Sequence, residues 1–364
     1  MAEAAGDGRG RLRELLAELT ETDGVSGQED AVRQAMGRHL APLGTLERDG
    51  LGSLCCIRRG GAASPRVMLA AHMDEIGFVV RDITDGGFLR LQAVGGWWEQ
   101  VVLAQRVTVH GRRRPVPGIV GSKPPHVLPA DERKKPVEFR DIFVDVGAAG
   151  RAEAEEWGIR PGDPVAPVCP FTDLGGRLWM GKALDDRSGC AVLVEVMRRL
   201  VEGAPHPNTV LAAATVQEEV GLRGADVAAR HWRPDIALAI DVGIAGDTPG
   251  IRPDESRAEL GKGPLVLGYD SSLIPNPRLR DLVADTATEE GIPIQWEVMG
   301  GGGTDAGRMQ FAGDGVPALA IGFPTRYIHS AAAVVHPDDM ESAVRLVLAV
   351  LRRLDAATAA AIRA

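Results

Sequence analysis

Cysteines are scarce in this sequence, and their spacing excludes two kinds of stabilising site. Only four occur among the 364 residues. Cys55 and Cys56 are neighbours, and neither Cys169 nor Cys190 belongs to a Cys-x-x-Cys motif. A disulfide framework or a thiolate metal site needs cysteines at paired spacings, so we expect these four to be reduced and without a chemical role.

Long apolar segments are missing as well. The chain starts with MAEAAGD, which holds no apolar signal core. No stretch approaches the roughly 18 uncharged apolar residues that a membrane span needs. The sequence therefore predicts a cytoplasmic protein without a membrane partner.

Positive charge is in deficit, since 41 Lys and Arg residues stand against 50 Asp and Glu residues and the net charge is -9. Nucleic acid is bound by clustered basic residues. The two short basic runs, at 112–114 and 133–135, lie near prolines and glycines that are typical of solvated loops. We therefore expect no nucleic-acid partner.

The apolar pattern divides the chain into an α/β host and a β-rich insertion. At 9–20 and 188–200, apolar residues recur with the spacing of one face of a helix. Short buried strands are expected at 67–71, 209–216, 236–240 and 317–321. The insertion instead shows short β-like runs between Gly and Pro turns, at 78–80, 88–91, 101–103, 106–109 and 142–146. We expect a small β-barrel domain at 76–164 inserted into a host made of residues 1–75 and 165–364.

A short polar motif precedes the second expected helix. Ser26 and Glu29 stand three residues apart, just before a segment with helical period. This is the spacing of a capping box, in which the two side chains accept hydrogen bonds from the backbone of the first helical turn. The sequence therefore predicts a helix with Ser26 as its N-cap that runs to about Leu40.

Several apolar segments end in residues that bind metals. The strand expected at 209–216 is followed by Glu218 and Glu219, at the strand end where open α/β sheets carry their chemistry. An isolated acid pair would be read as a solvated turn. Other segment ends, however, carry His72, Asp185, Asp241 and His329. Nitrogen and carboxylate ligands without thiolates suit zinc or cobalt, with manganese as a further candidate.

The number of candidate ligands favours two metal ions. A single catalytic zinc normally uses three protein ligands and keeps one position open. Five ligands suit two divalent ions that share a carboxylate, as in two-metal hydrolytic sites. We expect Asp185 to bridge, with His72 and Asp241 on one ion and Glu219 and His329 on the other.

Two further acids have expected roles beside these ligands. Glu218 is left free next to a ligand and close to the metal-bound water. It can take a proton from this water, which attacks as the hydroxide that bridges the ions, and return the proton to the leaving amine. Asp74, two residues after His72, is placed to hold the other ring nitrogen of that histidine. An ordinary turn residue is the alternative interpretation of Asp74.

Two other functions fit parts of the pattern. A metal-independent glycosidase would use Glu218 and Glu219 as acid and nucleophile. Adjacent strand residues point to opposite faces, which disfavours the facing pair, roughly 5–9.5 Å apart, that such enzymes need. A non-catalytic, metal-stabilised shell protein would bind the ions without turning over a peptide.

The chain also resembles a known family, the tetrahedral metallo-aminopeptidases, which include glutamyl and deblocking aminopeptidases and members named cellulase or endoglucanase. The matching motifs extend over nearly the whole chain, at 24–29 (GVSGQE), 71–78 (AHMDEIGF), 121–126 (GSKPPH), 181–187 (GKALDDR), 217–221 (QEEVG), 303–306 (GTDA) and 326–330 (RYIHS).

This resemblance implies a three-layer α/β/α zinc-peptidase domain with an inserted β-barrel domain. It implies a co-catalytic aminopeptidase that acts on peptides with two divalent ions per subunit. It gives Glu218 as the base and, as ligands, His72, Asp185, Glu219, Asp241 and His329. It also implies a homo-oligomer, a hollow tetrahedral dodecamer in which the inserted domain contributes to assembly and access control.

Overall fold

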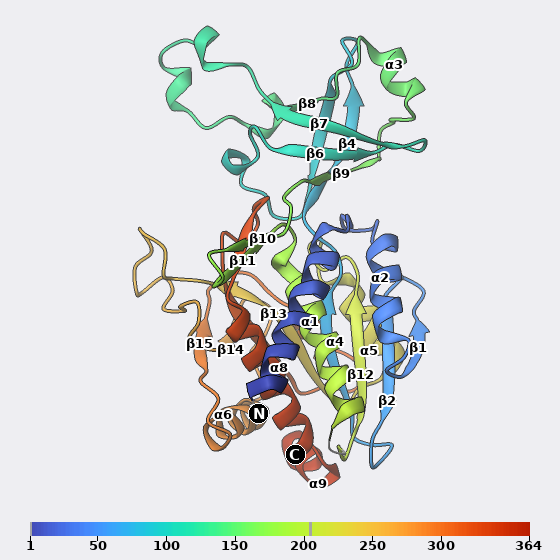
Figure 1. Ribbon diagram of the computed structural model, residues 1–364, viewed down its shortest axis with the longest axis vertical. Coiled ribbons are helices and arrows are strands. Elements are labelled where there is room, and N and C mark those ends of the chain that lie inside the picture. The colour runs from blue at the N-terminus through green and yellow to red at the C-terminus, as the bar shows by residue number, and fades with distance from the viewer. Residues whose placement is uncertain (1, 204–205) are drawn as a thin grey trace.

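The computed structural model describes residues 2–203 and 206–364, which form a large α/β body with a smaller barrel at one end (Figure 1). The body is built on a mixed sheet with four adjacent parallel strands at its centre. In spatial order these are β12 (Thr209–Thr215), β3 (Arg66–His72), β13 (Ile236–Ile244) and β16 (Ala318–Arg326). Because parallel strands end at the same edge of a sheet, the residues that follow them gather there.

Shorter strands extend this sheet on both sides. On one side lie β2 (Leu54–Arg59) and β1 (Thr45–Arg48). On the other side lie β17 (Ala333–Val335), β11 (Leu178–Gly181) and β10 (Thr172–Leu174). A branch from β16 is formed by β14 (Leu265–Tyr269) and β15 (Gln295–Val298).

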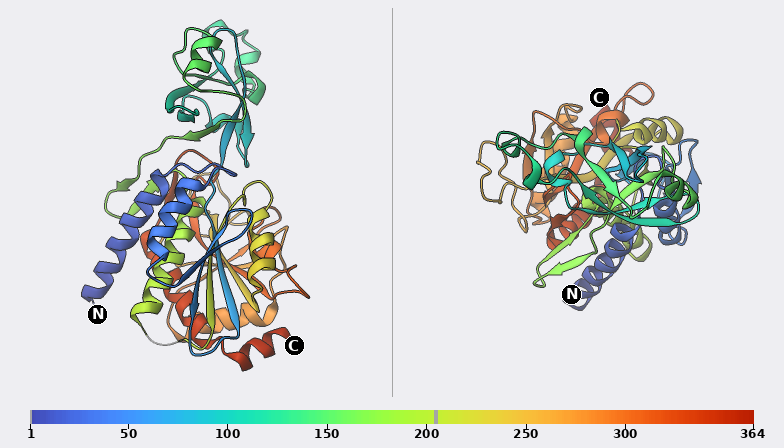
Figure 2. Two further views of the ribbon diagram at one scale, coloured as in Figure 1. Left: turned by 90° about the vertical axis from the view of Figure 1, so that its right-hand side faces the viewer. Right: turned by 90° about the horizontal axis from the view of Figure 1, so that it is seen from above.

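Helices cover both faces of the sheet, which gives the expected three layers (Figure 2). One face carries α1 (Ala2–Glu21), α2 (Asp30–Leu40), α4 (Leu184–Glu202), α6 (Pro277–Glu289), α8 (Pro337–Arg353) and α9 (Ala356–Arg363). The other face carries α5 (Arg223–Trp232) and α7 (Ala306–Met309).

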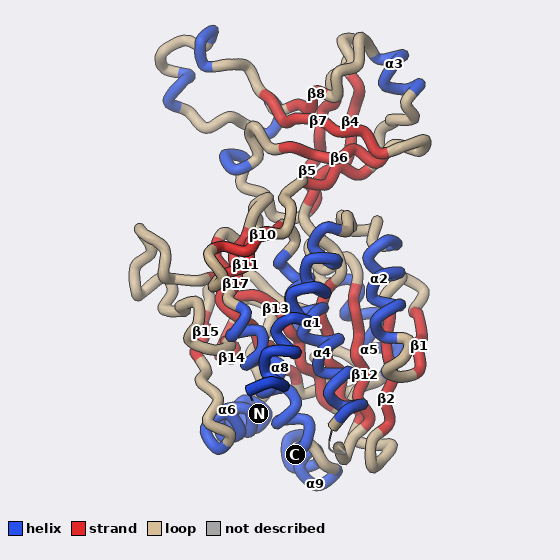
Figure 3. Tube along the Cα trace, in the orientation of Figure 1, coloured by secondary structure: helices blue, strands red, loops and turns tan. Residues whose placement is uncertain are grey.

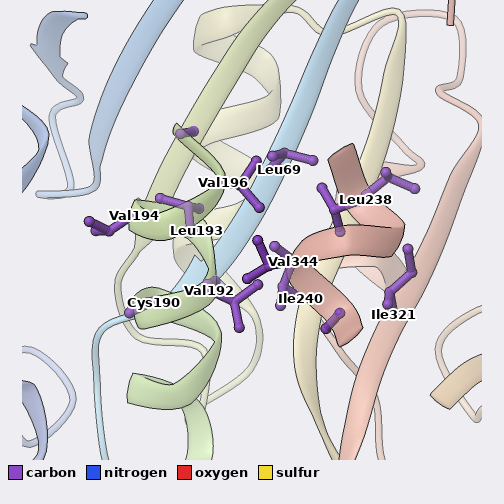
Figure 4. Packing of buried hydrophobic residues seen from close by; sticks show 14 of the residues in the cluster. Leu69, Cys190, Val192, Leu193, Val194, Val196, Leu238, Ile240, Ile321 and Val344 are labelled. Atoms are coloured by element: carbon purple, nitrogen blue, oxygen red, sulfur yellow. The ribbon is translucent and has the colours of Figure 1, made fainter. Parts of the chain in front are cut away.

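The sheet is buried on both faces because its central strands are continuously apolar. In β12, Val210 and Ala212 belong to the core beneath α4 and α8, while Leu211 and Ala213 belong to the core beneath α5. Figure 4 shows the first of these cores, where strand side chains such as Leu238 meet the two helices. Because the strands are packed on both sides, the polar residues at their ends are held in fixed positions.

The barrel is closed and antiparallel throughout (Figure 3). Its strands, in order around the barrel, are β4 (Gly77–Ile83), β5 (Leu89–Val94), β8 (Phe143–Asp145), β7 (Pro115–Gly121), β6 (Arg106–His110) and β9 (Pro164–Pro167). The segments between them hold α3 (Arg151–Glu156) and four 3₁₀ turns, η1 (Glu99–Val101), η2 (Pro125–Val127), η3 (Glu132–Lys134) and η4 (Phe139–Asp141). The predicted fold class, an α/β body with an inserted β-barrel, is confirmed.

One local prediction in the barrel is wrong, and one strand of the barrel was missed. The run at 101–103 is not a strand, since the N–H groups of Val101 and Val102 donate within a 3₁₀ turn, to Trp98 and Glu99. The strand β7 was not predicted, because Pro115 and Pro117 lack the N–H groups of a regular strand. It forms nevertheless, opposite β6 and β8.

The described chain holds no helix long and apolar enough to cross a membrane. All four cysteines are free thiols, in agreement with their spacing.

Candidate metal centre

Acids and histidines from separate segments meet beyond the carboxyl edge of the parallel strands. His72 ends β3, Asp185 lies at the start of α4, and Glu219 follows β12. His329 follows β16, and it lines one pocket together with Asp185 and Glu219. Asp241 lies within β13 rather than after it, because that strand continues to Ile244.

Asp185 stands between the two histidines. Its Oδ1 lies 3.0 Å from His72 Nε2, and its Oδ2 lies 3.4 Å from His329 Nε2. Each carboxylate oxygen therefore faces a different imidazole. This is the arrangement that a carboxylate shared by two ions requires.

Glu219 lies on the His329 side of the site. Its Oε2 is 3.4 Å from His329 Nε2. Its Oε1 is buried and has no hydrogen-bond partner among the described residues. A buried carboxylate oxygen without a donor is costly, and a cation would satisfy it.

Asp241 lies on the His72 side, together with an acid that sequence reasoning missed. Ligand atoms of His72, Asp186 and Asp241 lie within 4.8 Å of one another, as do those of His72, Asp185 and Glu219. Both groups could hold a metal ion. The oxygens of Asp186 already accept the backbone N–H groups of His72 (3.2 Å) and Gly189 (2.9 Å). We therefore retain Asp241 as the candidate ligand.

The site holds more buried carboxylates than its two imidazoles can balance. Burial raises the pKa of Glu219 to about 8, and burial also raises the pKa values of Glu218 and Asp241. The hydrogen bond to Asp185 raises the pKa of His329 to about 9. Divalent cations would remove this excess of negative charge, so the side chains present fit the metal ions that were predicted.

Asp74 is buried and holds parts of the site together. The Nδ1–H of His72 donates to the Asp74 carbonyl oxygen (3.1 Å), and Asp74 Oδ1 lies 3.5 Å from the same nitrogen. The carboxylate also accepts the backbone N–H groups of Glu218 (2.9 Å) and Glu219 (3.1 Å). Asp74 therefore contacts the histidine on one side and the acid pair on the other.

The predicted capping box is wrong. Helix α2 begins at Asp30 with Glu29 as its N-cap, and no side chain caps it. The Ser26 hydroxyl instead donates to Asp74 Oδ2 (2.6 Å), and Glu29 Oε1 accepts the backbone N–H groups of Gly27 and Gln217. The spacing alone suggested a helix cap, because partners from β3 and from the turn after β12 are distant in sequence.

A loop of the barrel also reaches the site. A Cβ added to Gly96 would lie 2.9 Å from His329 Nδ1, so the backbone of this residue lies close to the imidazole. A Cβ on Gly95 would lie 3.4 Å from Glu219 Oε2. Nothing in the sequence around these glycines pointed to this contact.

The seven residues predicted for the site are thus brought together, namely His72, Asp74, Asp185, Glu218, Glu219, Asp241 and His329. Residues 52–346 match the model of the M42 glutamyl aminopeptidase family. The chain belongs to this family. It is accordingly an enzyme, an aminopeptidase that releases N-terminal residues from peptides.

Similar proteins extend over almost the whole of this M42 chain. The glutamyl aminopeptidase of Lactococcus lactis is 35% identical over 350 residues, which cover 95% of this chain and 97% of that protein. The crystal structure of a TET aminopeptidase from the marine sediment archaeon Thaumarchaeota archaeon SCGC AB-539-E09 is 46% identical, with a TM-score of 0.94 and coverage of 96% and 99%. The Pyrococcus horikoshii TET1 peptidase, which can assemble into a tetrahedron or a large octahedral shell, is 34% identical, with a TM-score of 0.85 and coverage of 94% and 100%.

Proposed function

We propose that this M42 enzyme is a co-catalytic aminopeptidase with two divalent ions in each subunit. The observation that carries the proposal is Asp185, whose two oxygens face His72 and His329 separately. His72 and Asp241 would hold one ion, Glu219 and His329 the other, and Asp185 both. The ligand types favour zinc or cobalt and also accept manganese.

Such ions, when bound, polarise the scissile carbonyl and lower the pKa of water. The protein's own contribution begins with Glu218, whose Oε2 lies 3.9 Å from His72 Nε2 and whose side chain is 10% exposed. As general base, this carboxylate takes a proton from the attacking water and delivers it to the amine that leaves. Its low exposure keeps competing bulk water away from the proton transfer.

Asp74 supports both groups. By accepting the Nδ1–H of His72 at its carbonyl oxygen, it leaves Nε2 free to face the Asp185 carboxylate. By accepting the N–H of Glu218, it fixes the backbone from which the base projects. The proposed roles are therefore positioning for Asp74 and proton transfer for Glu218.

We further propose that the enzyme assembles from identical subunits into a hollow tetrahedral dodecamer in the cytoplasm. The assembly of the similar Pyrococcus horikoshii TET1 peptidase supports this. The barrel, with its position at one end of the body, would contribute to the contacts between subunits and to the control of peptide access.

The test is the pattern of products from a peptide with a free N-terminus. The metal-loaded enzyme should shorten it stepwise from that end, as followed by mass spectrometry, and excess chelator should stop the reaction. Cleavage at internal bonds would contradict the proposal. Hydrolysis of a soluble cellulose derivative in excess chelator would favour the glycosidase instead.

A further inference from the structure

The turn that carries Glu218 and Glu219 is attached to the body through three consecutive backbone N–H groups. That of Gln217 donates to Glu29 Oε1 (3.1 Å). Those of Glu218 and Glu219 donate to the two carboxylate oxygens of Asp74, at 2.9 and 3.1 Å. Two acids from the N-terminal part of the chain thus hold the turn.

The turn has a conformation that needs such support. Gln217 has a φ of +55°, in the left-handed region that residues other than glycine adopt infrequently. The hydrogen bonds inside the turn start from later residues, such as Gly221 and Leu222, whose N–H groups donate to the Glu218 carbonyl. The first three N–H groups of the turn therefore depend on Glu29 and Asp74.

The burial of Glu29 and its contacts with the backbone fit a role in holding this turn. The residue is 5% exposed, and its described contacts are to main-chain N–H groups, those of Gln217 and Gly27 (2.6 Å). No ion pair of its carboxylate occurs among the described residues, where its acceptor oxygen meets main-chain N–H groups. Burying another carboxylate close to an acidic site is unfavourable, so its position there calls for a compensating gain.

We propose that Glu29 is a positioning residue for the reaction, which fixes the Gln217 backbone so that Glu218 projects into the metal centre. Asp74 holds the next two residues, so the two acids act on adjacent peptide groups. The motif at 24–29 thereby contributes to the active site rather than to a helix cap. This inference rests on the proposed role of Glu218 as general base.

The test compares Glu29→Ala with Glu29→Gln in the full-length protein. Loss of one acceptor for a buried N–H should lower the kcat of the zinc-loaded Glu29→Ala enzyme roughly tenfold or more, with KM changed less than about threefold. Glu29→Gln keeps an acceptor oxygen and should retain most of the kcat. Glu153→Ala is the matched control, because Glu153 accepts a main-chain N–H (Ala149, 2.6 Å) next to α3 in the barrel.

A second readout does not depend on activity. In chelator-stripped protein, backbone amide exchange in the peptide that contains Gln217 should be faster in Glu29→Ala than in the wild type, and unchanged in Glu153→Ala. This comparison tests whether Glu29 positions the turn even if the wild type proves inactive. An inactive wild type would contradict the proposed function and not the role of Glu29.

Two results would overturn the inference. One is a Glu29→Ala enzyme with the kcat and the amide exchange of the wild type. The other is a Glu29→Gln enzyme that loses as much kcat as Glu29→Ala, since charge rather than hydrogen-bond acceptance would then matter. If Glu29→Ala fails to fold, Glu29→Leu takes its place, because it fills a similar space without offering an acceptor and should show the same loss of kcat and the same faster amide exchange.

Discussion

At the residue scale, the site is organised by where each carboxylate finds its partners. Asp74 and Asp186 have their oxygens occupied by main-chain N–H groups. Glu219 Oε1 has no partner among the described residues, and the oxygens of Asp185 face imidazoles. Acids of the first kind position the backbone, whereas acids of the second kind are available to ions.

The carboxylate of Glu218 is proposed neither to position the backbone nor to bind an ion, but to transfer a proton. Glu218→Gln keeps the size of the side chain and removes its basicity, so the bound metal should remain while turnover falls roughly 10²–10⁴-fold. Metal content by mass spectrometry and kcat on leucine p-nitroanilide measure the two effects. Near-normal activity in this variant would refute the assignment of the base.

Residues at strand ends could be predicted, because an apolar run that stops at an acid or a histidine can be recognised in the sequence itself. His72 and Glu219 were found in this way. The contacts of Glu29 and Gly96 could not be predicted, since each depends on a partner that is distant in sequence. For the same reason Ser26 and Glu29 were assigned to a helix cap, although their partners lie on other segments.

At the scale of elements, the loop after β5 connects the barrel to the metal centre. Trp97 anchors this loop, since its ring stacks on Phe78 with centroids 4.7 Å apart and its Nε1–H donates to the Gly77 carbonyl (3.0 Å). Gly96, the preceding residue, is in contact with His329. The imidazole is therefore held between an element of the barrel and Asp185 of the body.

Substituting this glycine should disturb one of the two proposed ions. A Cβ at Gly96 would be 2.9 Å from His329 Nδ1, so Gly96→Ala should displace the ring by a few tenths of an ångström. Altered support of a metal-bound histidine typically weakens affinity about 10–100-fold. We expect zinc titration to show one weakened site and one unchanged site.

The matched control is Gly86→Ala, also in the barrel, where the added Cβ would make ordinary contacts of 3.5 Å with Phe88. It should bind zinc as the wild type does. Wild-type affinity at both sites of Gly96→Ala would show that the barrel loop does not support His329.

Elements whose apolar residues recur at a regular spacing were predictable from the sequence, and elements without such spacing were not. The leucines at 12, 15, 16 and 19 are all buried in α1. The barrel strands were partly misassigned, because short strands with prolines, such as β7, give little alternation.

At the scale of the whole molecule, a partly buried polar contact links the body to the barrel. Asp23, just after α1, accepts from His110 Nε2 of β6 (2.7 Å) and from Lys182 Nζ (3.0 Å). Lys182 also donates to the buried Glu75 (2.6 Å). Although burial alone would raise it, the hydrogen bond from His110 and the charge of Lys182 lower the pKa of Asp23 to about 2.

This pKa sets a pH window for stability. The folded value lies below the usual aspartate pKa of about 3.9, so the stabilisation is fully present above that value and is lost as the pH falls toward 2. Asp23→Asn should therefore lower the free energy of unfolding by roughly 1–2 kcal/mol at pH 7. The difference from wild type should shrink between about pH 5 and pH 2.

Denaturant unfolding of both chelator-stripped proteins across this range measures the difference. Asp314→Asn, at an exposed residue, serves as the control and should show no such trend. A difference between Asp23→Asn and wild type that stays constant from pH 7 to pH 2 would contradict this account of the link.

A zinc titration of chelator-stripped protein tests most directly whether this M42 aminopeptidase uses two divalent ions that share Asp185, as proposed. Bound zinc per chain and hydrolysis of leucine p-nitroanilide are followed together, with cobalt and manganese added singly for comparison. We expect two ions per chain, and full turnover only when both are bound. Full turnover in the metal-free protein, or with a single ion per chain, would contradict it.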